Sequence, residues 1–257
     1  MNKKGIFAPT LVILTLIVFT HAVYVLIIQN PSGEAKELIG YYVVNLSNKF
    51  YEGDAALFAI KDSAKISIFN ALKELGENGG FVEPPDVCRK IKGYVVWDVS
   101  CDPTITGGLE GNYTYFFNKS FNKYLINHGF ENFYSYDLWV DDFGFNVSVT
   151  ARKNLVFKDD VIEYKLNTSF KREVDYNLLI YKDINDFVIT KRGCFLDKED
   201  PKECIDNKNL KAVKEGDVVL FDLESEGNYL IEENNELKFV KIKIKFAKDF
   251  TNIPSFT

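Results

Sequence analysis

Histidine is almost absent from this chain, which contains two histidines, His21 and His128, among 257 residues. His21 lies inside a long apolar segment, so one histidine is left for the rest of the chain. Catalytic bases and zinc sites rely heavily on histidine, and a pair or cluster of histidines cannot be assembled here. We therefore expect no metal site and no cofactor.

Recognised catalytic motifs are missing as well. The sequence has no G-x-S-x-G, no H-E-x-x-H and no phosphate-binding loop. The adjacent acids Asp141-Asp142 and Asp159-Asp160 would point to opposite faces of a strand, so each pair indicates a solvated turn rather than the acid pair of a glycosidase. We expect a protein that is not an enzyme.

The chain also lacks an excess of basic charge. It contains 31 Lys and Arg against 37 Asp and Glu, which gives a net charge of −6. A nucleic-acid partner would require a basic face, so we expect no nucleic-acid binding. The densest basic stretch, Lys238 to Lys248, alternates lysine with apolar residues. That alternation predicts a strand whose lysines lie on the solvated face.

The sequence does contain one long uncharged run, the 23 residues from Ile6 to Ile28, which follow Lys3 and Lys4. A helix of that length spans roughly 35 Å, enough to cross the hydrocarbon core of a bilayer. Lysines ahead of the run keep the N-terminus cytoplasmic by the positive-inside rule. We predict a single-pass cell-membrane protein that contacts lipid through Ile6 to Ile28, with the bulk of the chain extracytoplasmic.

Three fates of this segment stay open: an uncleaved anchor, a secretory signal peptide cut after Ala22, and a processed leader. The apolar run continues from Val23 to Ile28 beyond the signal-peptide site, which favours the anchor. Lys3-Lys4-Gly5 ahead of the run resembles the class III leader of archaeal pilins. That resemblance implies cleavage between Gly5 and Ile6, although Thr10 stands where pilins carry a glutamate.

Four cysteines fall into two close pairs, and an even number on an exported chain indicates local disulfides. We predict bonds from Cys88 to Cys101 and from Cys194 to Cys204. Neither pair has a C-x-x-C spacing or a nearby histidine, which argues against zinc and redox chemistry. Five Asn-x-Ser/Thr sequons, the acceptor sites of N-glycosylation, give weaker support for an extracytoplasmic location. Their asparagines are Asn45, Asn112, Asn118, Asn146 and Asn167.

Residues 34 to 77 carry apolar side chains at helical spacing, which predicts an amphipathic helix of about 65 Å. Gly53 is expected to kink or split this helix, and Gly76, Gly79 and Gly80 to end it. Its apolar stripe is expected to pack on the rest of the domain. The alternative is that part of the stripe pairs with a neighbouring subunit.

The rest of the chain predicts an α+β domain built on antiparallel strands. Period-two patterns, helical spacing and turn residues predict these elements: a hairpin in Val87–Cys101, a helix in Tyr113–His128, strands in Phe133–Phe170, a helix in Val174–Thr190, a charged loop in Lys191–Asn209, and strands near Val218–Leu223, Tyr229–Glu232 and Leu237–Phe246. Acids in the charged loop, Asp197, Glu199, Asp200 and Glu203, lack the pattern of a calcium-binding loop.

The predicted fold class is α+β: an N-terminal transmembrane helix continues into the long amphipathic helix and then into an extracytoplasmic antiparallel-sheet domain with two further helices. The predicted domains are an anchor (1–30), a helical stalk (31–80) and the extracytoplasmic domain (81–257).

Several stretches resemble a group of uncharacterised, membrane-anchored exported proteins of small-genome archaea. They are the run YEGDAALFAIKDSAKISIFNALKELGENGGF with its NGG turn at Asn78 to Gly80, the cysteine-bracketed hairpin, FNKYL in the aromatic helix and FDLES in a late strand. The resemblance extends from about Tyr41 onward. It implies location and fold, and no activity.

Three function hypotheses follow. The first is a membrane-anchored cell-surface structural or interaction module without catalysis, whose partner is itself, another surface protein or a glycan. The second is a pilin-like subunit processed after Gly5 and assembled into a surface filament. The third is an exported hydrolase that works with carboxylates alone.

Overall fold

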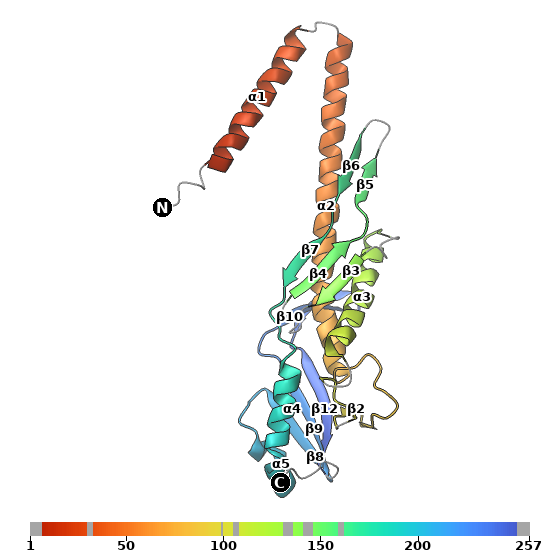
Figure 1. Ribbon diagram of the computed structural model, residues 1–257, viewed down its shortest axis with the longest axis vertical. Coiled ribbons are helices and arrows are strands. Elements are labelled where there is room, and N and C mark those ends of the chain that lie inside the picture. The colour runs from red at the N-terminus through yellow and green to blue at the C-terminus, as the bar shows by residue number, and fades with distance from the viewer. Residues whose placement is uncertain are drawn as a thin grey trace. The chain divides into compact units, whose positions relative to one another are not determined.

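The computed structural model in Figure 1 describes residues 7–29, 33–98, 100–104, 108–130, 136–140, 146–158 and 162–250. The fold is a mixed α+β architecture with antiparallel sheets, the predicted class. The chain divides into two compact units: residues 1–55 with 155–166, and residues 56–154 with 167–257. The predicted domain boundaries at residues 30 and 80 stay a prediction.

The first unit contains helix α1 (Phe7–Gln29), the first part of helix α2 (Gly33–Glu77), and a hairpin of β5 (Leu155–Lys158) and β6 (Glu163–Leu166). Neither an acidic nor a basic residue lies in the end turns of α1. Within the part of the chain that the structure describes, no helix is both long enough and apolar enough to cross a membrane.

Helix α2 passes through Gly53 without interruption, so the expectation that Gly53 splits it is wrong. The glycine instead provides space for an aromatic ring of the hairpin. A Cβ atom at position 53 would lie 2.5 Å from Cε1 of Tyr164, and the Tyr164 ring centroid lies 4.8 Å from that of Phe50. A side chain at position 53 would therefore force the Tyr164 ring to move.

In the second unit, α2 ends where the glycines predicted. Gly79 and Gly80 adopt positive φ angles of 63° and 90°, and the Gly80 amide donates to the Leu75 carbonyl at 2.8 Å. Such a left-handed ending satisfies carbonyls that the last helical turn leaves open. A Cβ at Gly76 would lie 2.2 Å from the Lys243 carbonyl oxygen, so the end of α2 rests directly on strand backbone.

The core of the second unit lies on a five-stranded sheet in the order β1-β2-β12-β9-β8. The strands β2 and β12 run parallel, and the other neighbours are antiparallel. Phe246 stacks on Trp97 at 4.0 Å and on Phe221 at 5.0 Å between ring centroids, and all three are buried. The strands are β1 (Lys90–Ile91), β2 (Tyr94–Val96), β8 (Leu210–Glu215), β9 (Val218–Glu224) and β12 (Lys243–Asp249).

Two smaller sheets complete the strands of this unit. One has the order β3-β4-β7, from β3 (Tyr136–Val140), β4 (Asn146–Ala151) and β7 (Phe170–Glu173); the other is the hairpin of β10 (Tyr229–Glu233) and β11 (Glu236–Val240). The single strand expected at Leu237–Phe246 is wrong. Its two ends, β11 and β12, belong to different sheets, because the chain turns at Ile242, whose amide donates to the Ser225 hydroxyl at 3.0 Å.

Helices α3 (Leu109–Asn127) and α4 (Ile180–Thr190) match two predicted helices, although α4 begins six residues later than the predicted segment. The expected loop at 191–209 is wrong in part. It contains the short helix α5 (Arg192–Asp197) and the 3-10 helix η2 (Pro201–Cys204). Figure 1 shows α4 beside β8 and β9, and residues of all three elements line a common cavity.

Candidate functional site

Two disulfides link Cys88 to Cys101 and Cys194 to Cys204, with Cα–Cα separations of 5.4 and 5.8 Å. These are the predicted pairs, and they use all four cysteines. Cys101 and Cys204 are buried. Both bonds close short loops within the second unit and so constrain those loops.

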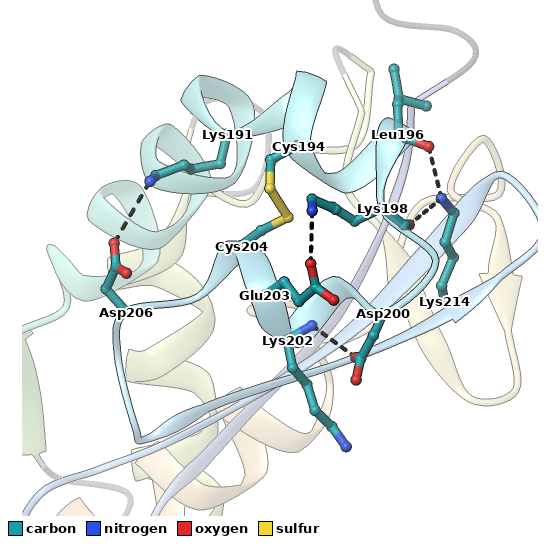
Figure 2. Close-up of a disulfide and its surroundings, with 10 residues drawn as sticks. All are labelled: Lys191, Cys194, Leu196, Lys198, Asp200, Lys202, Glu203, Cys204, Asp206 and Lys214. Atoms are coloured by element: carbon teal, nitrogen blue, oxygen red, sulfur yellow. Dashed lines mark hydrogen bonds and ion pairs between the residues drawn. A yellow bond between two sulfur atoms is a disulfide. The ribbon is translucent and has the colours of Figure 1, made fainter.

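The charged loop around the second disulfide is held by local interactions (Figure 2). Lys198 pairs with Glu203 at 2.8 Å, and the Asp200 carboxylate accepts the Lys202 backbone amide at 3.0 Å. The Lys214 ammonium, from β8, donates to two carbonyls at the end of α5, those of Leu196 and Lys198, each at 2.8 Å. Within the described residues, no group of three or more His, Cys, Asp or Glu is arranged to hold a metal ion.

The predicted sequon asparagines lie in different settings. Asn167 is exposed and its side chain accepts the Ser169 amide at 2.8 Å, whereas the half-buried Asn112 donates its amide to the Gly80 carbonyl at 2.9 Å. Asn45 on α2, Asn118 on α3 and Asn146 on β4 are half-buried. Among these five asparagines, Asn167 is the one whose side chain could carry a glycan with the least rearrangement of the surrounding residues.

Other predicted positions lie outside the described residues: the cleavage pair Gly5 and Ile6, and the paired acids at 141–142 and 159–160. His128 is exposed at the C-terminal cap of α3. Its backbone amide donates to carbonyls of the last helical turn.

The expectation that all lysines of the basic stretch face solvent is wrong at Lys248. Its side chain is 3% exposed, and its ammonium donates to the side-chain oxygen of Asn185 at 2.8 Å. The Asn185 amide in turn donates to the buried carboxylate of Asp102 at 2.6 Å. Burial lowers the pKa of Lys248, and the negative charges of Asp102 and Asp98 oppose that shift. This chain of contacts ties β12 and α4 to the loop after Cys101.

Three cavities follow one another along the connection between β7 and α4. A polar cavity of about 490 Å³ shares Asp175 with a central cavity of about 350 Å³, and the central cavity shares Ile180 and Asp183 with an apolar cavity of about 190 Å³. We name this row of cavities the acidic groove. Its lining residues are Asn146, Glu173, Val174, Asp175, Tyr176, Asn177, Ile180, Asp183, Ile184, Phe187, Asn207, Leu210, Leu223, Ser225, Glu226, Gly227 and Tyr229.

Local hydrogen bonds fix the walls of the groove. The Asn177 side chain accepts the Leu179 backbone amide at 2.8 Å, a turn that delays the start of α4 and leaves the preceding residues to line the groove. Across it, the Ser225 hydroxyl donates to the Gly227 carbonyl at 2.8 Å. The Tyr229 hydroxyl donates to the Asp175 carbonyl at 2.9 Å and joins the two walls.

Charge along the groove is of one sign. Glu173, Asp175, Asp183 and Glu226 line it, and its lining, as the described residues give it, includes no Lys, Arg or His. None of the four carboxylates forms an ion pair with another described residue. Burial, reinforced by the charges of Asp175 and Glu226, raises the pKa of Tyr229.

Sequence reasoning missed the groove. The apolar spacing of Val174–Thr190 predicted a helix through residues that the structure places in a loop. The signal that could have revealed the loop is Asn177 two residues before Leu179, because asparagine in that position favours a side-chain-closed turn over a helix.

No protein-family model, no curated protein and no solved structure matches the chain.

Proposed function

We propose that this chain is a membrane-anchored cell-surface interaction module without catalysis, held in the bilayer by Ile6 to Ile28 with its N-terminus in the cytoplasm and the second unit outside the cell. The observation that carries the proposal is the side-chain exposure along α1. Leu16, Ile17, Val18 and Phe19 are each about 59–67% exposed.

Successive residues of an α-helix are rotated by about 100°, so four consecutive apolar residues cover every face. A helix that is apolar all round is buried in a large core or in lipid. The proposed span takes in residues whose side chains lie outside the described part, and for these the argument rests on the sequence, which has no charge from Ile6 to Ile28.

The two disulfides support the outside location of the second unit. Disulfides persist in oxidising compartments and are rare where glutathione and thioredoxin keep thiols reduced. A chain with every cysteine paired fits an exported domain.

The test is extraction of native membranes with alkaline carbonate. The wild-type chain should stay with the membrane pellet. The double variant Leu16→Lys with Val18→Lys should appear in the supernatant, since a lysine near the middle of a span costs about 3 kcal/mol on insertion scales. Asp186→Lys, a change on the exposed face of α4, is the matched control and should leave the chain in the pellet. Release of the wild-type chain by carbonate would refute the proposal.

A second candidate function, the subunit of a surface filament, is favoured by the N-terminal part of α2. Tyr41, Tyr42, Val43 and Val44 are exposed by about 41–57%, although α2 is not part of the uncharged run. Apolar side chains on every face of a helix outside lipid need protein neighbours to cover them, and further copies of the chain would supply them. The mass of the native N-terminus, argued in the Discussion, separates the two functions.

A further inference from the structure

The acidic groove changes character along its length. The polar cavity lies between Asn146 and Asp175, whereas the apolar cavity at the other end is lined mainly by Ile184, Phe187, Leu210 and Leu223. We infer that the acidic groove binds an extended cationic peptide segment of a partner protein, with lysine or arginine along the polar and central cavities and an apolar side chain in the apolar cavity.

The electrostatic step rests on the four carboxylates of the groove. Because none has an ion-pair partner among the described residues, each can receive a cation without displacing a lysine or arginine that the structure describes. Carboxylates lined up along a concave surface concentrate the field there and attract positive ligands.

The steric step distinguishes a peptide from a smaller cation. The polar and central cavities have the volume of ordinary ligand pockets, about 300–1,000 Å³, and both are lined by Asp175. A bare metal ion would need several ligands converging on one point, and the described residues present no such group. A polyamine would satisfy the acids but would leave the apolar cavity, with its isoleucine, phenylalanine and leucine walls, in contact with water.

The inference rests on the proposed function only in taking the second unit as the part that meets a partner. The assay below uses the full chain in detergent micelles, so its outcome does not depend on where the chain sits in a cell. Carbonate extraction can therefore fail while the peptide binds, and the reverse can also occur.

The experiment measures the fluorescence anisotropy of a labelled peptide. In this peptide four lysines alternate with four glycines, and Leu-Phe follows at the C-terminus. We expect saturable one-to-one binding at low salt that weakens as salt rises, because exposed charge pairs are screened. Asp175→Asn with Glu226→Gln should weaken binding about 2- to 30-fold, as loss of two exposed ion pairs predicts. Asp186→Asn removes a single charge on the exposed face of α4, one turn beyond Asp183 and outside the lining, and should bind like the wild-type chain.

The apolar cavity has its own control. Phe187→Ala should weaken the peptide ending in Leu-Phe and leave unchanged the affinity of a peptide in which serines replace those two residues. Equal weakening of both peptides, or equal effects of Asp186→Asn and the double variant, would overturn the inference in favour of non-specific attraction to an acidic protein. Tight binding of spermine with no preference for the apolar peptide would overturn it in favour of a polyamine site.

Discussion

At the residue scale, the Tyr181 side chain illustrates the cost of an unmatched buried group. It is 1% exposed, and its hydroxyl has no hydrogen-bond partner among the described residues. Such a group retains its desolvation penalty, about 1–3 kcal/mol. Tyr181→Phe should therefore raise the free energy of unfolding by about 1 kcal/mol, measured by urea denaturation of the full chain in detergent.

The matched control is Tyr124→Phe. The Tyr124 hydroxyl, also in a buried residue, accepts the Asn70 side-chain amide at 2.9 Å. Its removal leaves that amide short of a partner and should lower the free energy of unfolding by about 1 kcal/mol. If both variants change the free energy of unfolding in the same direction, the lack of a hydrogen-bond partner does not explain the effect of Tyr181→Phe.

The same tyrosine sets a pH dependence. Burial raises the pKa of Tyr181 well above its ordinary value near 10, so above pH 10 the unfolded chain releases a proton that the folded chain keeps. The contribution of Tyr181 protonation to the free energy of unfolding is therefore fully present below about pH 10. It falls by about 1.4 kcal/mol per pH unit as the pH rises above 10. Urea denaturation at pH 9, 10 and 11 should show a shallower decline for Tyr181→Phe than for wild type; parallel curves would contradict the assignment.

At the element scale, two glycines of α2 predict opposite outcomes for one substitution. Nothing lies within 4 Å of a Cβ built on Gly40, so Gly40→Ala should gain the helix propensity of alanine, about 1 kcal/mol. Gly53→Ala gains the same propensity but places its methyl group 2.5 Å from the Tyr164 ring. Amide hydrogen exchange in β5 and β6 should speed up for Gly53→Ala and stay unchanged for Gly40→Ala. Unchanged exchange in both would show that the Tyr164 ring can move at little cost.

The second disulfide is an element-scale clamp on α5 and η2. Cys194→Ser with Cys204→Ser should lower the free energy of unfolding by about 2–4 kcal/mol, because the unfolded chain regains the freedom that the bridge removes. The native chain should show no titratable thiol, and tryptic mapping should find Cys194 linked to Cys204 and Cys88 linked to Cys101. Four free thiols in the purified protein would remove the support that the disulfides give to an outside location.

Elements set by local chemistry were predictable from the sequence, and elements set by distant contacts were not. The Lys92-Gly93 turn, the glycines that end α2 and the cysteine pairs carry their signals within a few residues. The break at Ile242 depends on Ser225, and the burial of Lys248 depends on Asn185 and Asp102, both far away in the chain. The acidic groove escaped prediction for the same reason, because the β9–β10 turn and the β7–α4 loop meet only in the folded unit.

At the scale of the whole molecule, the proposed anchor and the proposed filament make different use of the same segment. A helix that is apolar on every face is stable in lipid, and it can leave lipid only if neighbouring copies cover all its faces. Thr10, Thr15, Thr20 and Ala22 offer small or hydrogen-bonding contacts that would serve either a membrane bundle or a filament core.

The N-terminus of the native protein therefore distinguishes these fates, read by intact mass and N-terminal sequencing of membrane and extracellular fractions. We expect a chain that keeps Met1 or loses that residue alone, because no glutamate follows Gly5 at the fifth position to set the register between subunits. A start at Ile6 in extracellular material would favour the filament, and Tyr41 to Val44 of neighbouring copies should then cross-link through introduced cysteines. A start at Val23 would contradict both functions, since removal of residues 1–22 leaves an apolar run too short to span a bilayer.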